Sequence, residues 1–237
     1  MRFLSRLSKK IFLLLILVSF GTVNAQTEFD EDQLGAWYMY FYNTTFGESQ
    51  FGMQGDFQFR YFDEGGDLEQ ILLRSGFTYR PKNENILFTL GYGNITTGTF
   101  GEIKDKTHES RIYQEALLNQ KFGKRFLVAH RFRFEQRWVQ NQDFRTRYRY
   151  NLFLNVPFNK TSLEKNAVYL ALYNELFING QKDIGDGREV ELFDRNRTYL
   201  GLGYSIKNNL RVQFGWMKQT TANVSKGQLQ FSAHHSF

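Results

Sequence analysis

Arginine recurs at odd-numbered positions in two neighbouring stretches of the chain, 131–137 and 145–149. Positions 131, 133 and 137 are arginine with a glutamate at 135, and positions 145, 147 and 149 are arginine again. A guanidinium group presents a planar fork of N–H donors that matches carboxylate and phosphate groups. The chemistry that this row offers is therefore the recognition of anions. The residues between the arginines are mostly aromatic, among them Phe132, Phe134 and Tyr148.

The elements that must position this row are β-strands. A polar–apolar alternation with period two places one kind of side chain on each face of a strand, and it runs through most of the chain. Eleven segments show it, near residues 33–43, 50–61, 68–80, 86–94, 109–122, 125–138, 143–156, 167–178, 192–206, 210–218 and 227–237. Most of them exceed the roughly 5–6 residues of a globular strand. Their lengths fit the roughly 9–11 residues of a tilted strand that crosses a bilayer.

Residues 1–25 have the features of a secretory signal peptide. Four basic residues precede the apolar run 11–20, and a small-residue cleavage pattern ends at Ala25. Without this segment the chain has 26 Lys+Arg (30 − 4) and 24 Asp+Glu (24 − 0), a net charge of +2. This balance argues against nucleic acid as a partner, and the absence of cysteine excludes a disulfide scaffold or a lipoprotein. We predict a signal peptide over 1–25 and one barrel domain over 26–237.

The hydropathy of the chain limits the kind of membrane protein it can be. The mean hydropathy is −0.49 and no long apolar segment follows the signal, which excludes a helical membrane protein. Strands of a membrane β-barrel alternate, so their average is polar. The sequence therefore predicts an all-β, antiparallel transmembrane β-barrel of the outer membrane, with short periplasmic turns and longer acidic outer loops. Because bacterial barrels normally have an even number of strands, we expect about twelve, with ten as the alternative. The twelfth would lie within 95–109 or 179–191, or would come from a different division of the N-terminal segment.

The last segment, "LQFSAHHSF" (229–237), ends the chain on an aromatic residue. Its alternation and its terminal Phe237, together with Phe231, resemble the closing strand by which the barrel-assembly machinery recognises outer-membrane proteins. We therefore expect that machinery as a partner during biogenesis.

Several segments resemble one known family in their order along the chain. They are "GAWYMYF", "GGDLEQILLRSGFTY", "GYG", "RIYQEALLNQKFG", "HRFRFEQRW", "RYRYNLFLNVPFN" and "FDRNRTYLGLGY". The resemblance is to an outer-membrane barrel family known only as domain of unknown function 2490, of Bacteroidetes type, and it spans about 34–237. It implies the fold and the location, and it brings no activity and no catalytic residues.

The arginine row must face the barrel interior, because an arginine on the lipid face costs about 2–4 kcal/mol at mid-depth. The alternation predicts these lumen-lining residues: Arg60, Arg74, Arg111, Glu115, Arg131, Arg133, Glu135, Arg137, Arg145, Arg147, Arg149, Glu175, Arg195 and Arg197. One interpretation is a narrow, anion-preferring channel for small acidic solutes, since rows of arginine lower the barrier for anions. The other is a closed structural barrel, in which the arginines pair with the glutamates and with lumen tyrosines. Because a closed barrel would be expected to pair its charges more evenly, the excess of arginine over acid supports retaining the channel interpretation.

Other classes of function have weaker support in the sequence. A lipid hydrolase needs a serine and a histidine in contact on the outer surface, and no G-x-S-x-G element marks outward Ser75 or Ser110. An accessory subunit of an outer-membrane complex would leave no sequence signal. We predict no catalytic residues, no cofactor and no metal site, and we expect outer-membrane lipid and lipopolysaccharide as partners. Gly91 and Gly93 are expected to make room for bulky lumen side chains.

Overall fold

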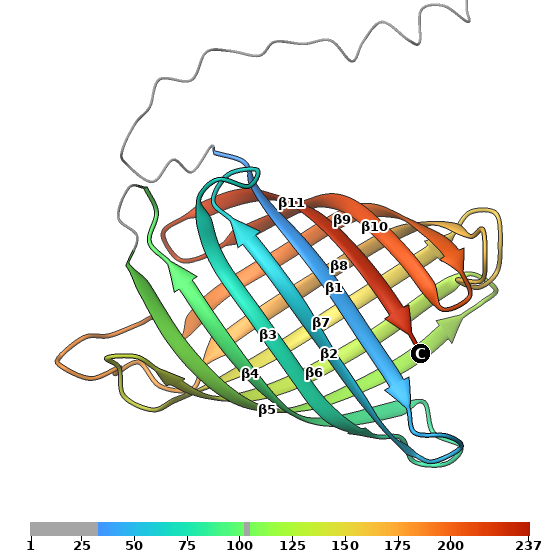
Figure 1. Ribbon diagram of the computed structural model, residues 1–237, viewed down its shortest axis with the longest axis horizontal. Coiled ribbons are helices and arrows are strands. Elements are labelled where there is room, and N and C mark those ends of the chain that lie inside the picture. The colour runs from blue at the N-terminus through green and yellow to red at the C-terminus, as the bar shows by residue number, and fades with distance from the viewer. Residues whose placement is uncertain (1–32, 102–104) are drawn as a thin grey trace, which may run out of the picture.

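The computed structural model describes residues 33–101 and 105–237, which form eleven β-strands (Figure 1). The predicted signal peptide lies outside the described residues. The strands are β1 (Gly35–Thr45), β2 (Phe51–Tyr61), β3 (Leu68–Tyr79), β4 (Ile86–Gly98), β5 (Lys106–Phe122), β6 (Phe126–Val139), β7 (Arg145–Pro157), β8 (Val168–Asn179), β9 (Phe193–Lys207), β10 (Leu210–Thr220) and β11 (Ser225–Ser236). Within the described ranges, no helix combines the length and the apolar character that crossing a membrane requires.

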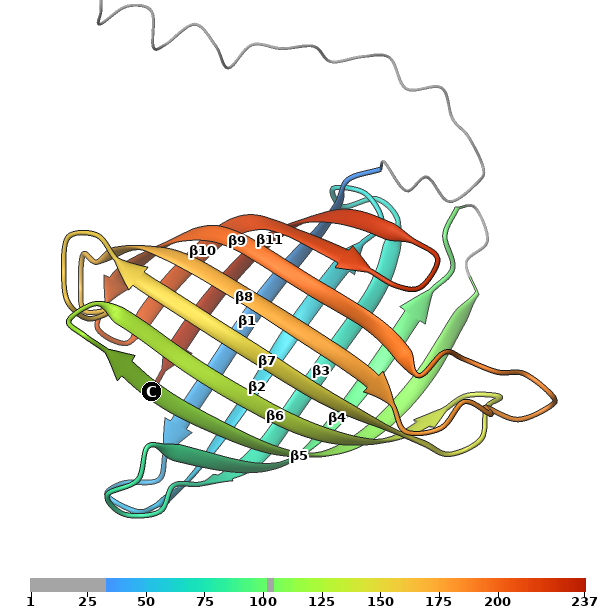
Figure 2. The same cartoon turned by 180° about the vertical axis from the view of Figure 1, so that it is seen from behind.

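The strands form one sheet that closes on itself. Each strand pairs antiparallel with its neighbours in the chain, and β1 and β11 complete the ring by running parallel to each other. Along this seam the register runs from Gly35 opposite Gln228 to Asn43 opposite Ser236. The strands are tilted relative to the long axis and wind around it, as the two opposite views show (Figures 1 and 2). The predicted all-β, mainly antiparallel barrel is confirmed.

The number of strands is eleven, between the ten and the twelve expected from the sequence. Residues 95–98 extend β4, and β5 begins at Lys106. Residues 180–191 contain an isolated bridge between Asp183 and Glu189 in place of a further strand. An odd number closes here because the seam is parallel. The consequence is that Gly35 and Phe237 lie at opposite ends of the barrel.

The two ends of the barrel differ in their connections. The end that holds Phe237, called here the C-terminal end, carries the turns β1–β2, β3–β4, β5–β6, β7–β8 and β9–β10. The opposite end, called here the loop end, carries the remaining connections, including residues 180–192 between β8 and β9. In the β2–β3 loop, the Asp63 carboxylate accepts hydrogen bonds from three backbone N–H groups at 2.7–3.0 Å. Burial alone raises the pKa of Asp63, but these bonds outweigh burial and hold the pKa below its usual value.

The two faces of the wall differ sharply in chemistry. Phe132 is 54% exposed on the outside, whereas its neighbour Arg133 is 6% exposed on the inside. The same change of side from one residue to the next recurs along the other strands, so that large aromatic and aliphatic side chains cover the outside. A sheet with an apolar outer face and a polar inner face is the reverse of a soluble β-barrel and is typical of a membrane barrel.

Glycines make room for the bulkiest interior side chains. A Cβ on Gly91 would lie 2.1 Å from the ring of Tyr113, the residue directly opposite it on β5. A Cβ on Gly203 would lie equally close to Tyr169, which is fully buried. The expectation that Gly91 accommodates a lumen side chain is confirmed, and each tyrosine ring lies close to the glycine opposite it on the neighbouring strand.

Candidate functional site

The residues predicted to line the lumen lie together inside the barrel. All of them except Glu135 line one of two interior cavities, and Glu135 lies between their side chains at 1% exposure. They are Arg60, Arg74, Arg111, Glu115, Arg131, Arg133, Glu135, Arg137, Arg145, Arg147, Arg149, Glu175, Arg195 and Arg197. They are contributed by β2, β3 and β5 to β9.

Strand register aligns four of these arginines in one row across the wall. Arg74 lies opposite Gly93, which in turn lies opposite Arg111. Arg111 faces Arg137, and Arg137 faces Arg145. Gly93 leaves room for its neighbour, because a Cβ there would lie 2.9 Å from Cγ of Arg74. Like charges that face each other across strands destabilise a sheet unless counter-charges reach them, so the row requires anions.

Glu109 supplies the counter-charge for the middle of this row. Its two oxygens accept hydrogen bonds from Arg111 at 2.5 and 2.8 Å and from Arg137 at 2.6 and 3.1 Å. Arg145, the next arginine in the row, has no carboxylate within 4.0 Å among the described residues. Its buried Nε has no hydrogen-bond partner. One acid thus bonds two guanidinium groups, of which it can neutralise only one charge, and the third guanidinium group is left without an anion.

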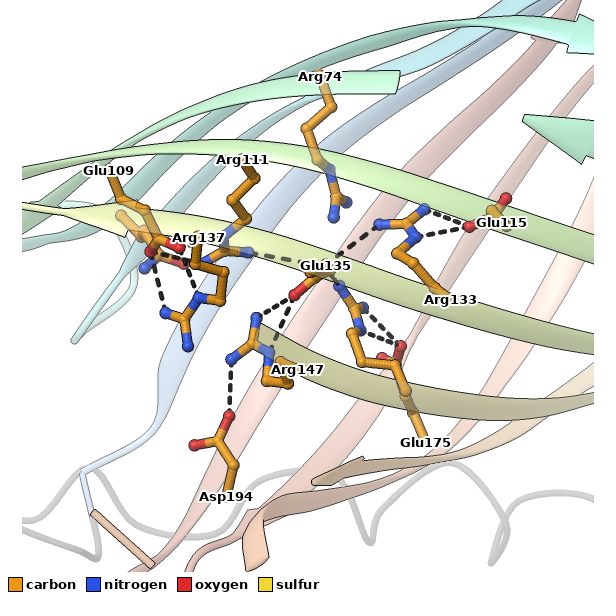
Figure 3. Close-up of polar contacts among 12 residues, drawn as sticks. Arg74, Glu109, Arg111, Glu115, Arg133, Glu135, Arg137, Arg147, Glu175 and Asp194 are labelled. Carbon is orange, nitrogen blue, oxygen red and sulfur yellow. Dashed lines mark hydrogen bonds and ion pairs between the residues drawn. The ribbon is translucent and has the colours of Figure 1, made fainter. Parts of the chain in front are cut away.

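Glu135 is the centre of a second group of contacts (Figure 3). It accepts two hydrogen bonds from Arg147, at 2.7 and 2.9 Å, and one from Arg149 at 2.6 Å. Nη1 of Arg111 and Nη1 of Arg133 lie 3.9 Å from the same carboxylate. Four guanidinium groups from β5, β6 and β7 therefore surround one buried glutamate. Charge-assisted bonds of this length are the strong ones in proteins.

Several contacts reach between strands that are not neighbours in the barrel. Gln54 on β2 donates to Glu115 on β5 at 3.0 Å, and Arg133 donates to the same carboxylate at 2.6 Å. Arg131 on β6 donates to Glu175 on β8 at 2.7 Å. Since β2 and β5 are separated by two strands, the Gln54–Glu115 bond crosses part of the interior.

Two further acids reach the interior although the alternation did not include them. Asp194 accepts from Arg147 at 2.6 Å and from Arg195 at 3.0 Å. Glu69 accepts from the indole N–H of Trp37 at 3.1 Å. Both lie where the strand register shifts, and such a β-bulge adds a residue and moves the next side chain to the other face. Assigning the two faces of a strand by alternate positions therefore misses these two acids. The only feature of the sequence that points to them is their place at the end of a strand, next to a loop.

Three interior arginines lack a carboxylate within 4.0 Å in the described part of the chain: Arg60, Arg145 and Arg211. Arg60 donates instead to two neutral amide oxygens and stacks over Trp37, with its guanidinium carbon 3.8 Å from the ring centroid. Arg197 lies 4.8 Å from the same centroid. Stacking on an aromatic ring stabilises a guanidinium group without removing its charge.

Two cavities occupy the interior. The one that extends toward the C-terminal end has a volume of about 350 Å³ and is lined by Phe41, Asn155 and His234, among others. The second extends toward the loop end and has a volume of about 280 Å³. We call the second one the arginine chamber. Its charged lining consists of nine arginines and one acid, namely Arg60, Arg74, Arg111, Arg137, Arg145, Arg147, Arg149, Arg195, Arg197 and Glu109.

Among the residues that the structure describes, no serine contacts a histidine on the outer surface. The outward-facing Ser75 and Ser110 are each hydrogen-bonded to a tyrosine hydroxyl, at 2.7 and 2.8 Å. A Ser–His contact of 3.1 Å joins Ser232 and His234, which both line the cavity near the C-terminal end. In the part of the chain that the structure describes, no cluster of three or more His, Cys, Asp or Glu side chains could hold a metal ion.

The two residues assigned to the assembly signal lie on the outside of the last strand and at the chain end. Phe231 is 40% exposed and stacks on Phe214, with ring centroids 4.5 Å apart. Phe237 is 70% exposed and lies against His235 at 4.1 Å. Both side chains therefore present apolar surface at the β1–β11 seam side of the barrel.

Comparison with known protein families identifies this chain's family. A family model described as "Protein of unknown function (DUF2490)" matches residues 34–230. No curated protein matches the chain. The matched range runs from the start of β1 into β11 and so includes the whole interior network.

Proposed function

Since the chain belongs to the DUF2490 family of proteins of unknown function, we propose a function from its geometry: a closed structural barrel of the bacterial outer membrane, of Bacteroidetes type. The apolar outer face supports the membrane location, because exposed apolar side chains such as Phe77 (68%) and Leu90 (59%) would be unfavourable in water and suit lipid. A signal peptide over residues 1–25 would direct the export.

The observation that carries the closed state is a chain of contacts through the interior. Gln54 on β2 binds Glu115 on β5, and Arg131 on β6 lies 3.7 Å from the same carboxylate. Arg131 also binds Glu175 on β8, and Arg197 on β9 lies 4.0 Å from Glu175. These contacts link strands on several sides of the barrel. In a closed barrel, a passing solute would have to displace contacts of this kind.

A second candidate is a narrow, anion-preferring channel, and one observation favours it. Some interior arginines have no carboxylate nearby in the described part of the chain, and the lining of the arginine chamber has nine arginines but one acid. Both features give the interior a positive potential. A pore with this lining would favour small anionic solutes and repel cations.

The partners that fit this proposal are those of an outer-membrane protein. They are membrane lipid and lipopolysaccharide around the wall, and the barrel-assembly machinery, which would recognise Phe231 and Phe237. A role as an accessory subunit of a larger complex is tested by copurification. We propose no catalytic activity: the position of His234 inside the barrel and the absence of a described carboxylate bonded to it give a lipid hydrolase little support.

The test is the single-channel current of the refolded mature chain in a planar bilayer under a salt gradient. The closed barrel predicts no conductance from protein that is demonstrably folded and inserted. Discrete, anion-selective steps would contradict the closed barrel and support the channel. In that case Arg133→Glu and Arg147→Glu should each weaken or reverse the anion preference. Arg125→Glu is the matched control, since this arginine is exposed in the β5–β6 turn and should leave the preference unchanged.

A further inference from the structure

The arginine chamber has more positive charge than its own carboxylates neutralise. Glu109 is its only lining acid, and its two oxygens are already occupied by Arg111 and Arg137. Asp56, Glu135, Glu175 and Asp194 contact other arginines of the lining from its edges. Nine guanidinium groups therefore share five carboxylates (1 + 4). The difference leaves the chamber strongly positive.

One guanidinium group in the chamber is placed for a ligand. Arg145 is 8% exposed, lines the chamber, and has a buried Nε with no hydrogen-bond partner. It faces Arg137 directly across the β6–β7 pair. The Cβ atoms of directly opposed residues lie about 4.5–5.5 Å apart, and like charges on such a pair destabilise it unless an anion compensates them. An unmade hydrogen bond at a buried charged donor is also costly.

We propose that the arginine chamber binds a phosphate group, either as inorganic phosphate or as part of a small phosphorylated solute. A phosphate group has up to two negative charges and several acceptor oxygens, and it can accept from more than one guanidinium fork at once. A carboxylate offers only two oxygens and one charge, and chloride offers no directional acceptor. Thr97 and Thr107 in the same lining add hydroxyl donors.

The size and the position of the chamber define which phosphorylated molecules fit. Its volume of about 280 Å³ is at the lower limit of ligand pockets, which span roughly 300–1,000 Å³. It therefore suits phosphate or a compact phosphate ester and excludes an oligomer. The lining residues Thr97, Thr107 and Gln142 belong to the loop-end parts of β4 and β5 and to the β6–β7 loop, so the ligand arrives from the loop end.

This inference does not depend on whether the barrel conducts. Binding is measured on the refolded mature chain in detergent, and conductance in a bilayer, so either proposal can fail alone. The titrants are sodium phosphate and glycerol 1-phosphate, added in separate calorimetric titrations at low ionic strength, with sodium acetate and sodium chloride as comparison anions. We expect saturable binding of at least one phosphate compound with one site per chain, and binding at least about tenfold weaker for acetate and chloride.

The variants test the assigned residue. Arg145→Gln should weaken phosphate binding by about tenfold or more, because a charged donor is lost from a buried site. Arg145→Lys keeps the charge but loses the fork and should bind more weakly than the wild type. Arg125→Gln, at the opposite end of the barrel, should bind as the wild type does.

Three results would overturn the inference. They are the absence of saturable binding of both phosphate compounds to folded protein, equal binding of acetate, and unchanged affinity in Arg145→Gln. If Arg145→Gln does not fold, the wild-type titrations together with Arg145→Lys decide the question, with unchanged affinity in Arg145→Lys counting against the site.

Discussion

Glu135 is the residue whose loss should disturb the interior most. The substitution Glu135→Gln keeps the shape of the side chain and removes its charge. The glutamine would then face Arg147 and Arg149, which bind the native carboxylate at 2.6–2.9 Å, and two more guanidinium groups at 3.9 Å. Since all four are buried, bulk water compensates the missing charge poorly. The fold must then hold positive charges together without their common anion.

The size of the effect follows from the burial of the network. Removing one partner of a buried ion pair costs about 3–5 kcal/mol, because an uncompensated charge is left behind. Here Arg147 keeps Asp194 at 2.6 Å and Arg149 keeps Glu175 at 2.5 Å. These carboxylates retain part of the stabilisation, so we expect a loss near the lower limit, about 3 kcal/mol in the free energy of unfolding.

The assay is equilibrium unfolding of the refolded mature chain in urea, followed by tryptophan fluorescence. Trp37 lies inside the barrel at 2% exposure and reports on the interior. Glu191→Gln is the matched control, because this glutamate is exposed in the β8–β9 loop and its ion pair with Lys182 is long, at 3.9 Å. A surface pair of this kind contributes about 0–1 kcal/mol.

A double substitution separates the loss of the pair from the penalty for an unpaired charge. Adding Arg147→Gln to Glu135→Gln removes one of the guanidinium groups left without its anion, so the double variant should lose less stability than the sum of the two single variants. A loss below about 1 kcal/mol for Glu135→Gln, equal to that of the control, would refute the reasoning. The network would then contribute little to the free energy of unfolding.

Three other predictions address the wall and a loop. Gly91→Ala should lower the free energy of unfolding by about 1–3 kcal/mol in the same urea assay, because the new Cβ would overlap the ring of Tyr113. Gly65→Ala is the control and should leave the free energy of unfolding unchanged, since no atom lies within 4 Å of its Cβ position. Phe132→Arg should impair insertion into lipid vesicles, at a cost of about 2–4 kcal/mol, while Phe132→Leu inserts normally; equal insertion of both would place this face away from lipid. The lowered pKa of Asp63 means that the β2–β3 turn gains stability above the unfolded pKa of about 3.9 and loses it as pH falls below that value. Amide exchange in the turn should therefore stay slow at pH 5, and fast exchange there would contradict the assigned bonds.

The alternation of residue types was sufficient to predict the wall. Side chains on a strand point to opposite faces in turn, and a lipid environment makes the choice of face unambiguous, since Arg133 cannot replace Phe132 on the outside without a large cost. The strand positions follow from the same pattern to within a few residues, for example β6 at Phe126–Val139 against the predicted 125–138. The interior location of the arginines is a direct result of this local rule.

Closure and charge pairing were decided only by the tertiary structure. The parallel β1–β11 seam depends on which edges meet, and no local pattern specifies that. The alternation marks eleven segments, but only the seam shows that the barrel closes with this odd number. Asp194 and Glu69 enter the interior through bulges, where one inserted residue reverses the parity on which the sequence prediction depends. The register of several strands decides which arginines contact a carboxylate and which, like Arg145, do not. Side-chain alternation is set by each residue's immediate neighbours, whereas ion pairing is set by distances between residues that the chain brings together only when the sheet closes.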